Sequence, residues 1–393
     1  MRRVYLDHIA ATPVLPEVLA AMLPFFAEQF GNLQSLHSDG QGIQDAVAEA
    51  RENVARLVNA AEVEIVFVSG GSEANNLALK GMAPAVKAKG THLVLSSVEH
   101  SSVLNAAKSL DKQGFSTTLI PVDSAGRVDP AAVESALRPE TVLVSVQLAN
   151  SEVGTIQPVA EIAKRCRARN ILVHTDAVAA VGNMPVDVRA LGVDALSLAG
   201  DQFYGPKGSG ALFIRKGVKI LTLIDGGIQE GGKRAGTENI PAIVGLGKAA
   251  EVARLKMDER LSASIALRDR LLTELPRRVE HVLVTGSLTD RLPHHASFAV
   301  RFVEGEAMLL HLDLKGVAAS SGSACTSKSL KVSHVHLALG LDHATAQGSI
   351  VFSLIDTTTD ADIDTLLDVF PPIIDRLRKM SPLYTEFLKE NPR

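Results

Sequence analysis

The 393-residue sequence contains only two cysteines, Cys166 and Cys325. Two cysteines are too few for a disulfide framework, and unpaired thiols suit a reducing compartment such as the cytoplasm. No apolar run approaches the roughly 20 residues that a membrane-spanning helix needs. Asp7, His8 and Pro13 interrupt the segment behind the basic start, so no secretory signal is expected. The sequence therefore predicts a cytoplasmic protein that does not enter a membrane.

An excess of positive charge is also absent, because 40 lysines and arginines stand against 44 aspartates and glutamates, a formal net charge of −4. Proteins that bind nucleic acid or anionic membranes usually carry a positive surface, and nothing in this balance predicts one. Internal repeats and low-complexity tracts are missing as well. We therefore expect a globular protein, long enough to bury a large core and to form more than one lobe.

Short β-branched segments alternate with stretches of helical apolar spacing along the first part of the chain. Strands are predicted at residues 64–68, 91–96, 117–121, 141–147, 171–174, 195–198 and 210–214. Helices are predicted at residues 16–30, 43–58, 73–87 and 159–169. Because helices separate several mostly apolar strands, we expect an α/β fold with a mainly parallel seven-stranded sheet between helices.

A second, smaller α/β lobe is expected after a long helix over residues 241–275. Its predicted elements are strands at residues 282–285, 296–302 and 349–354 and a closing helix at residues 360–380. The boundary between the lobes is expected near residue 255. The segment before Pro16 can join either lobe, and we assign it to the smaller one. The predicted domains are therefore residues 14–255, and residues 1–13 together with 256–393.

Polar residues follow three of the predicted strands. Ser72 lies in a Ser-Gly-Gly-Ser-Glu turn before a helix, where free N–H groups and the helix dipole favour an anion such as phosphate. A strand-to-helix turn with a serine cap explains the same pattern. His100 and Asp176 follow two other strands, and each can equally be a hydrogen-bonded loop residue or a helix cap. Because ligands of open α/β sheets bind at the carboxyl ends of strands, we predict one crevice for Ser72, His100 and Asp176.

A loop of Ser, Gly and Ala surrounds Cys325, after a short apolar strand that starts at Val317. Small residues without packing side chains favour an exposed loop. The Cys325 thiol is therefore presented as a nucleophile or a soft metal ligand would be. A serine-rich turn that merely contains a thiol is an equally good explanation of the loop alone.

These residues, in this order, resemble the cysteine desulfurases of the NifS/IscS type, pyridoxal-phosphate (PLP) enzymes of the class V aminotransferase group. Matching motifs extend from Tyr5-Leu6-Asp7 to Ser381-Pro382-Leu383 and include residues 30–32, 69–70, 99–100, 174–176, 204–208, 234–239 and 320–327. The resemblance implies the fold-type I architecture, with a large lobe, a smaller lobe and a two-fold homodimer. It also implies an iron–sulfur scaffold protein or a sulfur acceptor protein as partner.

The resemblance also implies roles for individual residues. Ser72 and its neighbours would hold the phosphate of PLP, and Thr237 would reach in from the other subunit. His100 would stack on the cofactor ring, and Asp176 would pair with the pyridinium nitrogen. Cys325 would attack the substrate sulfur and become a persulfide.

The chain departs from the family pattern at several of these positions. Gln202 stands at the Schiff-base lysine, after Asp201 in place of a histidine. Glutamine forms hydrogen bonds but forms no imine and takes no proton at neutral pH. Val351 replaces the arginine expected to clamp the substrate carboxylate, and it supplies no charge-assisted hydrogen bond. Ser151 and Ala179 replace two further polar side chains.

We therefore predict a cysteine-desulfurase-like protein of iron–sulfur cluster assembly or sulfur transfer, a pseudoenzyme without PLP-imine chemistry. Cys325 would carry a persulfide or ligate an iron–sulfur cluster. Ser72, His100, Asp176 and Thr237 leave non-covalent PLP binding open. Two alternatives stay open. One is a non-catalytic subunit that pairs with an active paralogue, and the other is a PLP-dependent desulfurase or related lyase with an altered mechanism.

Overall fold

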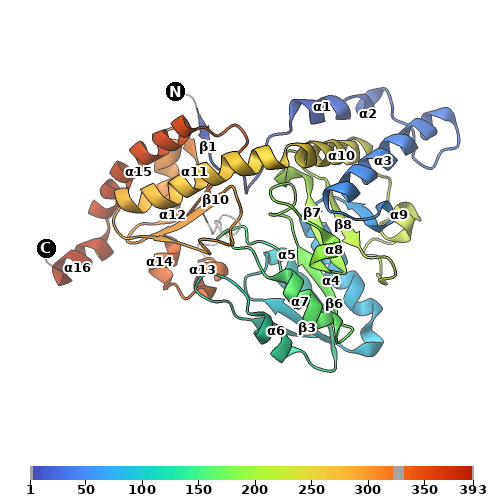
Figure 1. Cartoon of the computed structure of the whole chain (residues 1–393), viewed down its shortest axis with the longest axis horizontal. Helices are drawn as coiled ribbons and strands as arrows, with labels where there is room; N and C mark the ends of the chain where they lie inside the picture. Colours follow the sequence, from blue (N-terminus) through green and yellow to red (C-terminus); the bar gives the residue numbers. More distant parts are fainter. Residues whose placement is uncertain (1–2, 322–331, 392–393) are drawn as a thin grey trace.

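The computed structural model describes residues 3–321 and 332–391, which form two lobes (Figure 1). The large lobe contains a seven-stranded sheet of order β2-β8-β7-β6-β5-β3-β4. Its strands are β2 (Ile65–Val68), β3 (His92–Ser96), β4 (Ser116–Ile120), β5 (Thr141–Ser145), β6 (Leu172–Asp176), β7 (Ala195–Ala199) and β8 (Gly210–Ile214). Only β8 runs antiparallel to its neighbours β2 and β7. The prediction of a mainly parallel seven-stranded sheet is confirmed.

Helices cover both faces of this sheet because its central strands are apolar on both sides. Every residue of β3, β5, β7 and β8 is buried. One face packs against α4 (Gly71–Ala85) and α5 (Ser101–Asp111), and the other against α3 (Ser38–Leu57), α7 (Val159–Arg167) and α10 (Ile240–Leu255). The shorter helices of this lobe are α1 (Pro16–Met22), α2 (Pro24–Ala27), α6 (Pro130–Ala136), α8 (Val188–Leu191) and α9 (Gln229–Gly232).

The small lobe contains a three-stranded antiparallel sheet of order β12-β10-β9. Its strands are β9 (Val282–Val284), β10 (His295–Val300) and β12 (Ser349–Ser353), and a parallel pair, β1 (Val4–Tyr5) with β11 (Val317–Ala318), lies beside them. A separate core joins the sheet to α11 (Met257–Arg278), α12 (Gly305–Asp313) and α15 (Asp360–Lys379). The remaining helices are α13 (His334–Ala338), α14 (His343–Gln347) and α16 (Pro382–Glu390).

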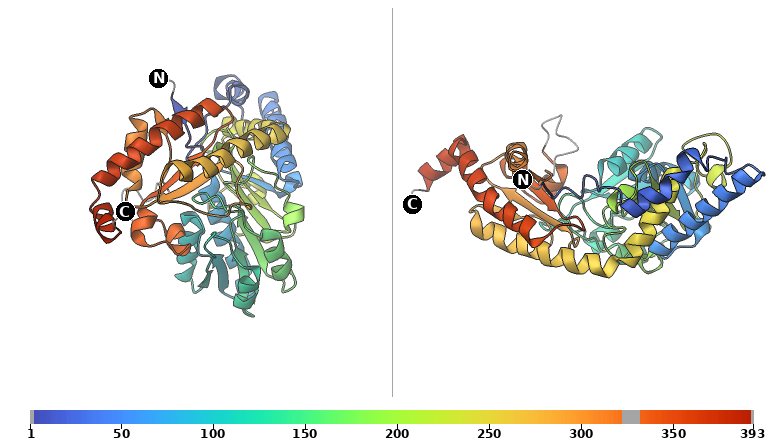
Figure 2. Two further views of the ribbon diagram at one scale, coloured as in Figure 1. Left: turned by 60° about the vertical axis from the view of Figure 1, so that its left-hand side comes forward. Right: turned by 90° about the horizontal axis from the view of Figure 1, so that it is seen from above.

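Two helix predictions need correction. The predicted helix over residues 16–30 is divided into α1 and α2, because Pro24 lacks the N–H group that a continuous helix needs. The predicted helix over residues 241–275 is divided at Lys256, whose φ of −101° and ψ of 9° end α10. Helix α10 packs on the large-lobe core and α11 on the small-lobe core, and the right-hand view of Figure 2 shows the bend between them. None of the helices in the described ranges is both long and apolar enough to span a membrane.

Candidate functional site

A glycine turn joins β2 to α4 and leads into Ser72. Gly70 adopts a φ of +152°, which favours glycine. A Cβ atom on Gly71 would lie 2.6 Å from the Val178 side chain, so the turn packs closely against the segment after β6. Ser72 is exposed in the first turn of α4, where backbone N–H groups have no acceptor inside the helix. This end of α4 can therefore bind a phosphate group.

Asp176, at the end of β6, belongs to a buried hydrogen-bond network. Asn75 donates to one carboxylate oxygen at 2.6 Å, and the Val178 N–H donates to the other at 3.0 Å. Burial raises the pKa of Asp176, whereas nearby His100 and these hydrogen bonds lower it. The carboxylate keeps lone pairs free for a cationic partner, such as a protonated ring nitrogen.

His100 is connected to Asp176 through two residues that the sequence analysis did not single out. The His100 Nδ1 atom lies 2.7 Å from the Ser102 hydroxyl, which accepts a hydrogen bond from Asn75 at 2.9 Å. Asn75 follows Ser72 by three residues and therefore lies on the same side of α4. That spacing is the sequence signal that could have identified Asn75. Hydrogen bonds thus connect His100 to Asp176 through Ser102 and Asn75, about one turn along α4 from Ser72.

Glu99 is a further buried acid that the sequence analysis listed only within a motif. One of its oxygens accepts hydrogen bonds from the Ser96 hydroxyl at 2.5 Å and from the Gln147 N–H at 2.8 Å. Its other oxygen has no partner within the described part of the chain. Burial, assisted by the charge of Asp176, raises the pKa of Glu99 to about 8. Glu99 is therefore mostly protonated at neutral pH.

Gln202 lies after β7 on a short 3₁₀ turn, η3 (Gly200–Gln202), and is 7% exposed. Its side-chain amide donates to the Ile9 carbonyl at 3.3 Å. The backbone carbonyl of Gln202 accepts hydrogen bonds from His8 Nε2 at 2.9 Å and from the Asn183 side chain at 3.1 Å. The nearby Lys207 ammonium donates to the Thr12 carbonyl at 3.1 Å and does not take the place of Gln202. Position 202 is therefore well anchored but carries no amine.

Two further predicted residues lie on other elements. Thr237 is exposed and lines a cavity of about 130 Å³ together with Arg234 and with Ser69, which precedes the glycine turn. Val351 is buried in the middle of β12, where it exchanges two backbone hydrogen bonds with Ser320, at 2.8 and 3.1 Å. Val351 brings no charge to the site.

Cys325 lies outside the described residues, so its predicted role stays a prediction. Within residues 3–321 and 332–391, no three His, Cys, Asp or Glu side chains are grouped to hold a metal ion. The other cysteine, Cys166, is fully buried in α7, and burial raises the pKa of its thiol to about 12.

The donor set fits PLP. Asp176 provides an anion for the ring nitrogen, the half-buried His100 side chain provides an aromatic face, and the start of α4 provides N–H groups for the phosphate. Gln202 provides no amine for covalent attachment. A fold of this kind, with such residues at the carboxyl ends of the strands, defines the fold-type I PLP proteins.

Comparison with known proteins identifies the family. The family model for aminotransferase class V matches residues 4–366. The chain is 48% identical over 386 residues to the cysteine desulfurase IscS of Dictyoglomus turgidum, with 98% of each chain covered. It is 46% identical over 382 residues to the cysteine desulfurase IscS of Methanosarcina thermophila, with 97% of this chain and 94% of the other covered.

Solved structures agree with this result. A NifS-like protein superposes with a TM-score of 0.88 at 35% identity, covering 95% of this chain and 99% of the other. A NifS-like protein from Rickettsia africae superposes with a TM-score of 0.86 at 28% identity, covering 95% and 100%. The chain therefore belongs to the class V aminotransferase family, among the cysteine desulfurases of the NifS/IscS type.

Proposed function

We propose that this chain works in sulfur transfer or iron–sulfur cluster assembly as a cysteine-desulfurase-like protein whose working group is the Cys325 thiol. The similarity to proteins named cysteine desulfurases supports a role in handling the sulfur of cysteine. The proposal that this chain does not use imine chemistry rests on Gln202, an amide in the lysine position. Its side chain and its backbone carbonyl are both hydrogen-bonded. An amide forms no Schiff base, so this chain receives sulfur rather than extracting it by imine chemistry.

The chemistry of Cys325 in this proposal is an exchange between sulfur atoms. Its thiolate attacks the outer sulfur of a persulfide on a donor protein and forms a new S–S bond. The donor's S–S bond breaks, its inner sulfur leaves as a thiolate, and one proton re-equilibrates with water. Electrons balance without an added oxidant or reductant. The same thiolate is a suitable ligand for an iron–sulfur cluster that a scaffold protein shares.

PLP has a defined place in this proposal. When bound, the cofactor serves as an electron sink for bonds at the α-carbon of an amino acid. Asp176 would hold the ring nitrogen, His100 would cover the ring, and the first turn of α4 at Ser72 would hold the phosphate. Gln202 would contribute a hydrogen-bonding amide in place of a covalent anchor.

The proposal includes a cytoplasmic homodimer. Exposed apolar side chains on and beside α1 and α2 support a covered surface in this region, among them Leu23, Phe26 and Phe30, which are 58, 62 and 79% exposed. Ile228, directly before α9, is also 80% exposed. Burying side chains of this size removes a large apolar area from water. The further partner is an iron–sulfur scaffold protein or a sulfur acceptor protein.

A second candidate function is a non-catalytic subunit that completes the site of an active paralogue. The exposed position of Thr237 favours it, because a neighbouring subunit can reach this hydroxyl. Purification from the native host distinguishes the two assemblies. A pure homodimer contradicts the second candidate, whereas a stable heterodimer supports it.

The main experiment follows sulfur on the two cysteines. The chain is incubated with a small-molecule persulfide, and tryptic peptides are analysed by mass spectrometry for one added sulfur atom. We expect the sulfur on Cys325 and not on Cys166, whose buried thiol serves as an internal control. Cys325→Ser should abolish the modification.

Two companion measurements cover the other arms of the proposal. After anaerobic purification, iron and sulfide that disappear in Cys325→Ser support the cluster role. The proposal would be overturned if Cys325 took up no sulfur and held no cluster. Release of sulfide from free cysteine with added PLP would favour the enzyme of altered mechanism instead.

A further inference from the structure

The chain from residue 4 to residue 15, called the N-terminal strap here, connects the two lobes. At its start, β1 pairs with β11 of the small lobe. Further along, the Thr12 N–H and hydroxyl groups both donate to the Asp201 carbonyl, at 3.1 and 2.8 Å. The Tyr204 N–H donates to the Thr12 oxygen at 2.8 Å. The strap therefore holds the segment of residues 200–204, called the Gln202 turn, on the large lobe.

His8, in the middle of the strap, contacts both lobes with one side chain. Its Nε2 atom lies 2.9 Å from the Gln202 carbonyl oxygen on the large lobe. Its ring lies 4.5 Å, between centroids, from the ring of His294, which directly precedes β10 of the small lobe. The Tyr204 ring lies 5.6 Å from the His8 ring, between centroids, in a T-shaped arrangement. His8 is 2% exposed, so water does not compete for these contacts.

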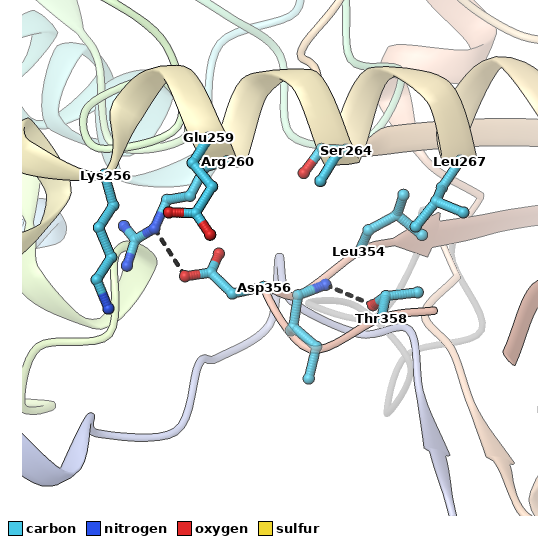
Figure 3. A pocket seen from close by; sticks show the side chains of 10 residues that line it. Lys256, Glu259, Arg260, Ser264, Leu267, Leu354, Asp356 and Thr358 are labelled. Carbon is cyan, nitrogen blue, oxygen red and sulfur yellow. Dashed lines mark hydrogen bonds and ion pairs between the residues drawn. The ribbon is translucent and has the colours of Figure 1, made fainter. Parts of the chain in front are cut away.

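Tyr204 provides a second link from the Gln202 turn to the small lobe. Its hydroxyl donates at 2.7 Å to the carboxylate of Asp356, which follows β12 in the sequence. The same carboxylate lies 2.7 Å from Arg260 Nε on α11, and this pair borders a cavity of about 230 Å³ (Figure 3). The Arg260 guanidinium lies 4.7 Å from the centre of the Tyr204 ring. The turn is therefore held to the small lobe at both His8 and Tyr204.

The Gln202 turn is also connected to the Asp176 network. Asn183 donates to the Gln202 carbonyl at 3.1 Å and to the Ala179 carbonyl at 3.3 Å. Ala179 follows Asp176 by three residues, in the segment that packs against the glycine turn before α4. Asn183 therefore links the Gln202 turn by hydrogen bonds to the segment that follows β6, at the carboxyl ends of the strands.

We propose that His8 is a positioning residue that holds the Gln202 turn against the small lobe, and that protonation of its ring releases this hold. Because Nε2 donates to the Gln202 carbonyl, the second proton would have to bind Nδ1. That atom is buried and has no hydrogen-bond partner within the described residues. A buried charge without a partner is costly, so the charged ring disfavours the closed arrangement.

Some groups around the His8 ring raise its pKa and others lower it. Burial lowers the pKa of His8, while the Gln202 carbonyl, Asp356 and the nearby Leu354 backbone raise it and Arg260 lowers it. The neighbouring His294 has a pKa well below its ordinary range, first because of burial and then because of His8, His295 and Arg268. Tyr204 stays neutral, since burial and Asp356 raise its pKa.

The sign of the pH effect follows from this balance. In the unfolded chain His8 takes up a proton near pH 6.5, whereas in the closed arrangement it does so at lower pH. The contribution of neutral His8 is therefore complete above about pH 6.5 and is lost as the pH falls below that value. The hold on the Gln202 turn should weaken in the same range.

Hydrogen–deuterium exchange of the Phe203 and Tyr204 amides in the full chain tests the proposal, after correction for the intrinsic pH dependence of exchange. In the parent, we expect protection at neutral pH that decreases below about pH 6.5. His8→Asn keeps a donor for the Gln202 carbonyl and does not titrate, so it should keep the protection and lose the pH step. His8→Ala should exchange roughly tenfold faster at neutral pH, the effect of about one lost hydrogen bond.

His92→Asn is the matched control, because His92 is a buried histidine on β3, where it lies 2.8 Å from each of the Thr118 and Thr141 hydroxyls. It should keep the parental pH step at the Gln202 turn. An unchanged turn in His8→Ala, or a full pH step in His8→Asn, would overturn the proposal. If His8→Ala does not fold, the pH profile of His8→Asn decides. The readout requires neither PLP nor sulfur transfer, so it is independent of the proposed function.

Discussion

The two sides of the candidate site are held in different ways. The Asp176 side is a network of side chains, in which Asn75, Ser102 and His100 join a buried carboxylate. The Gln202 side is held mostly through backbone carbonyls, which accept hydrogen bonds from the strap and from Asn183. A change of side chain at position 202 therefore changes the available chemistry but leaves the anchors of the turn in place. This difference explains how the family fold persists without the lysine.

The largest expected effect is the gain of covalent PLP binding in Gln202→Lys. The backbone anchors of the turn do not depend on the side chain at position 202, so the new amine should be presented next to the site. After incubation with PLP and borohydride reduction, we expect about one bound cofactor per chain by mass spectrometry, and none in the parent.

Gln202→Met is the control for this gain, because it has similar length and no amine. If Gln202→Lys binds PLP reversibly but yields no reduced adduct, the backbone-held side does not present position 202 toward the cofactor. The conclusion that the anchors of the Gln202 turn do not depend on the side chain at position 202 would then be wrong.

Glu99→Gln should stabilise the protein, because the Asp176 side contains a carboxyl group that stays protonated. Glu99 has a pKa of about 8, whereas an unfolded glutamate ionises near pH 4.5, so the parent loses stability as the pH rises between these values. Glutamine avoids this loss, which amounts to about 3 kcal/mol at pH 7. Urea unfolding at several pH values measures the effect, and an equal gain at pH 4.5 and pH 7 would contradict it.

Acid should lower the free energy of unfolding through His174, a buried histidine on β6. Burial lowers the pKa of His174 to about 3, and its ring lies between the Ser145 and Ser197 hydroxyls, at 2.8 and 2.9 Å. The unfolded chain binds a proton near pH 6.5, so stability decreases as the pH falls below that value. His174 alone accounts for a loss of about 2 kcal/mol between pH 6.5 and pH 5. His174→Asn should reduce this loss in urea titrations, and an unchanged slope would show that His174 is protonated in the fold.

The smallest effect is expected for Asp176→Asn, which keeps the shape of the network but removes its charge. PLP affinity should fall roughly tenfold, because a charge-assisted hydrogen bond becomes a neutral one. Fluorescence titration with PLP measures the change.

Asp194→Asn is the matched control. Asp194 is a partly buried acid that accepts a hydrogen bond from the Val173 N–H at 2.9 Å, just before β7 and away from the site. The same loss of affinity in both variants would show that the charge of Asp176 does not act locally.

Periodicity and turn residues predicted the seven strands of the large sheet, since apolar strands between amphipathic helices can be buried in few ways. The rule that ligands bind at the carboxyl ends of strands predicted that His100 and Asp176 would lie together. The Asn75–Ser102 connection was not predictable, because it joins α4 to α5 through side-chain geometry. The break at Lys256 was missed for a similar reason, since helical spacing continues across it.

By itself, the sequence determined the family, the sheet and the absence of an amine at position 202, because these follow from residue types and their spacing along the chain. Only the tertiary structure decided how Gln202 is anchored, that Glu99 keeps its proton and that His8 contacts both lobes. Burial and long-range hydrogen bonds control these properties. They depend on which distant segments meet in space, and no local pattern around Gln202, Glu99 or His8 encodes that meeting.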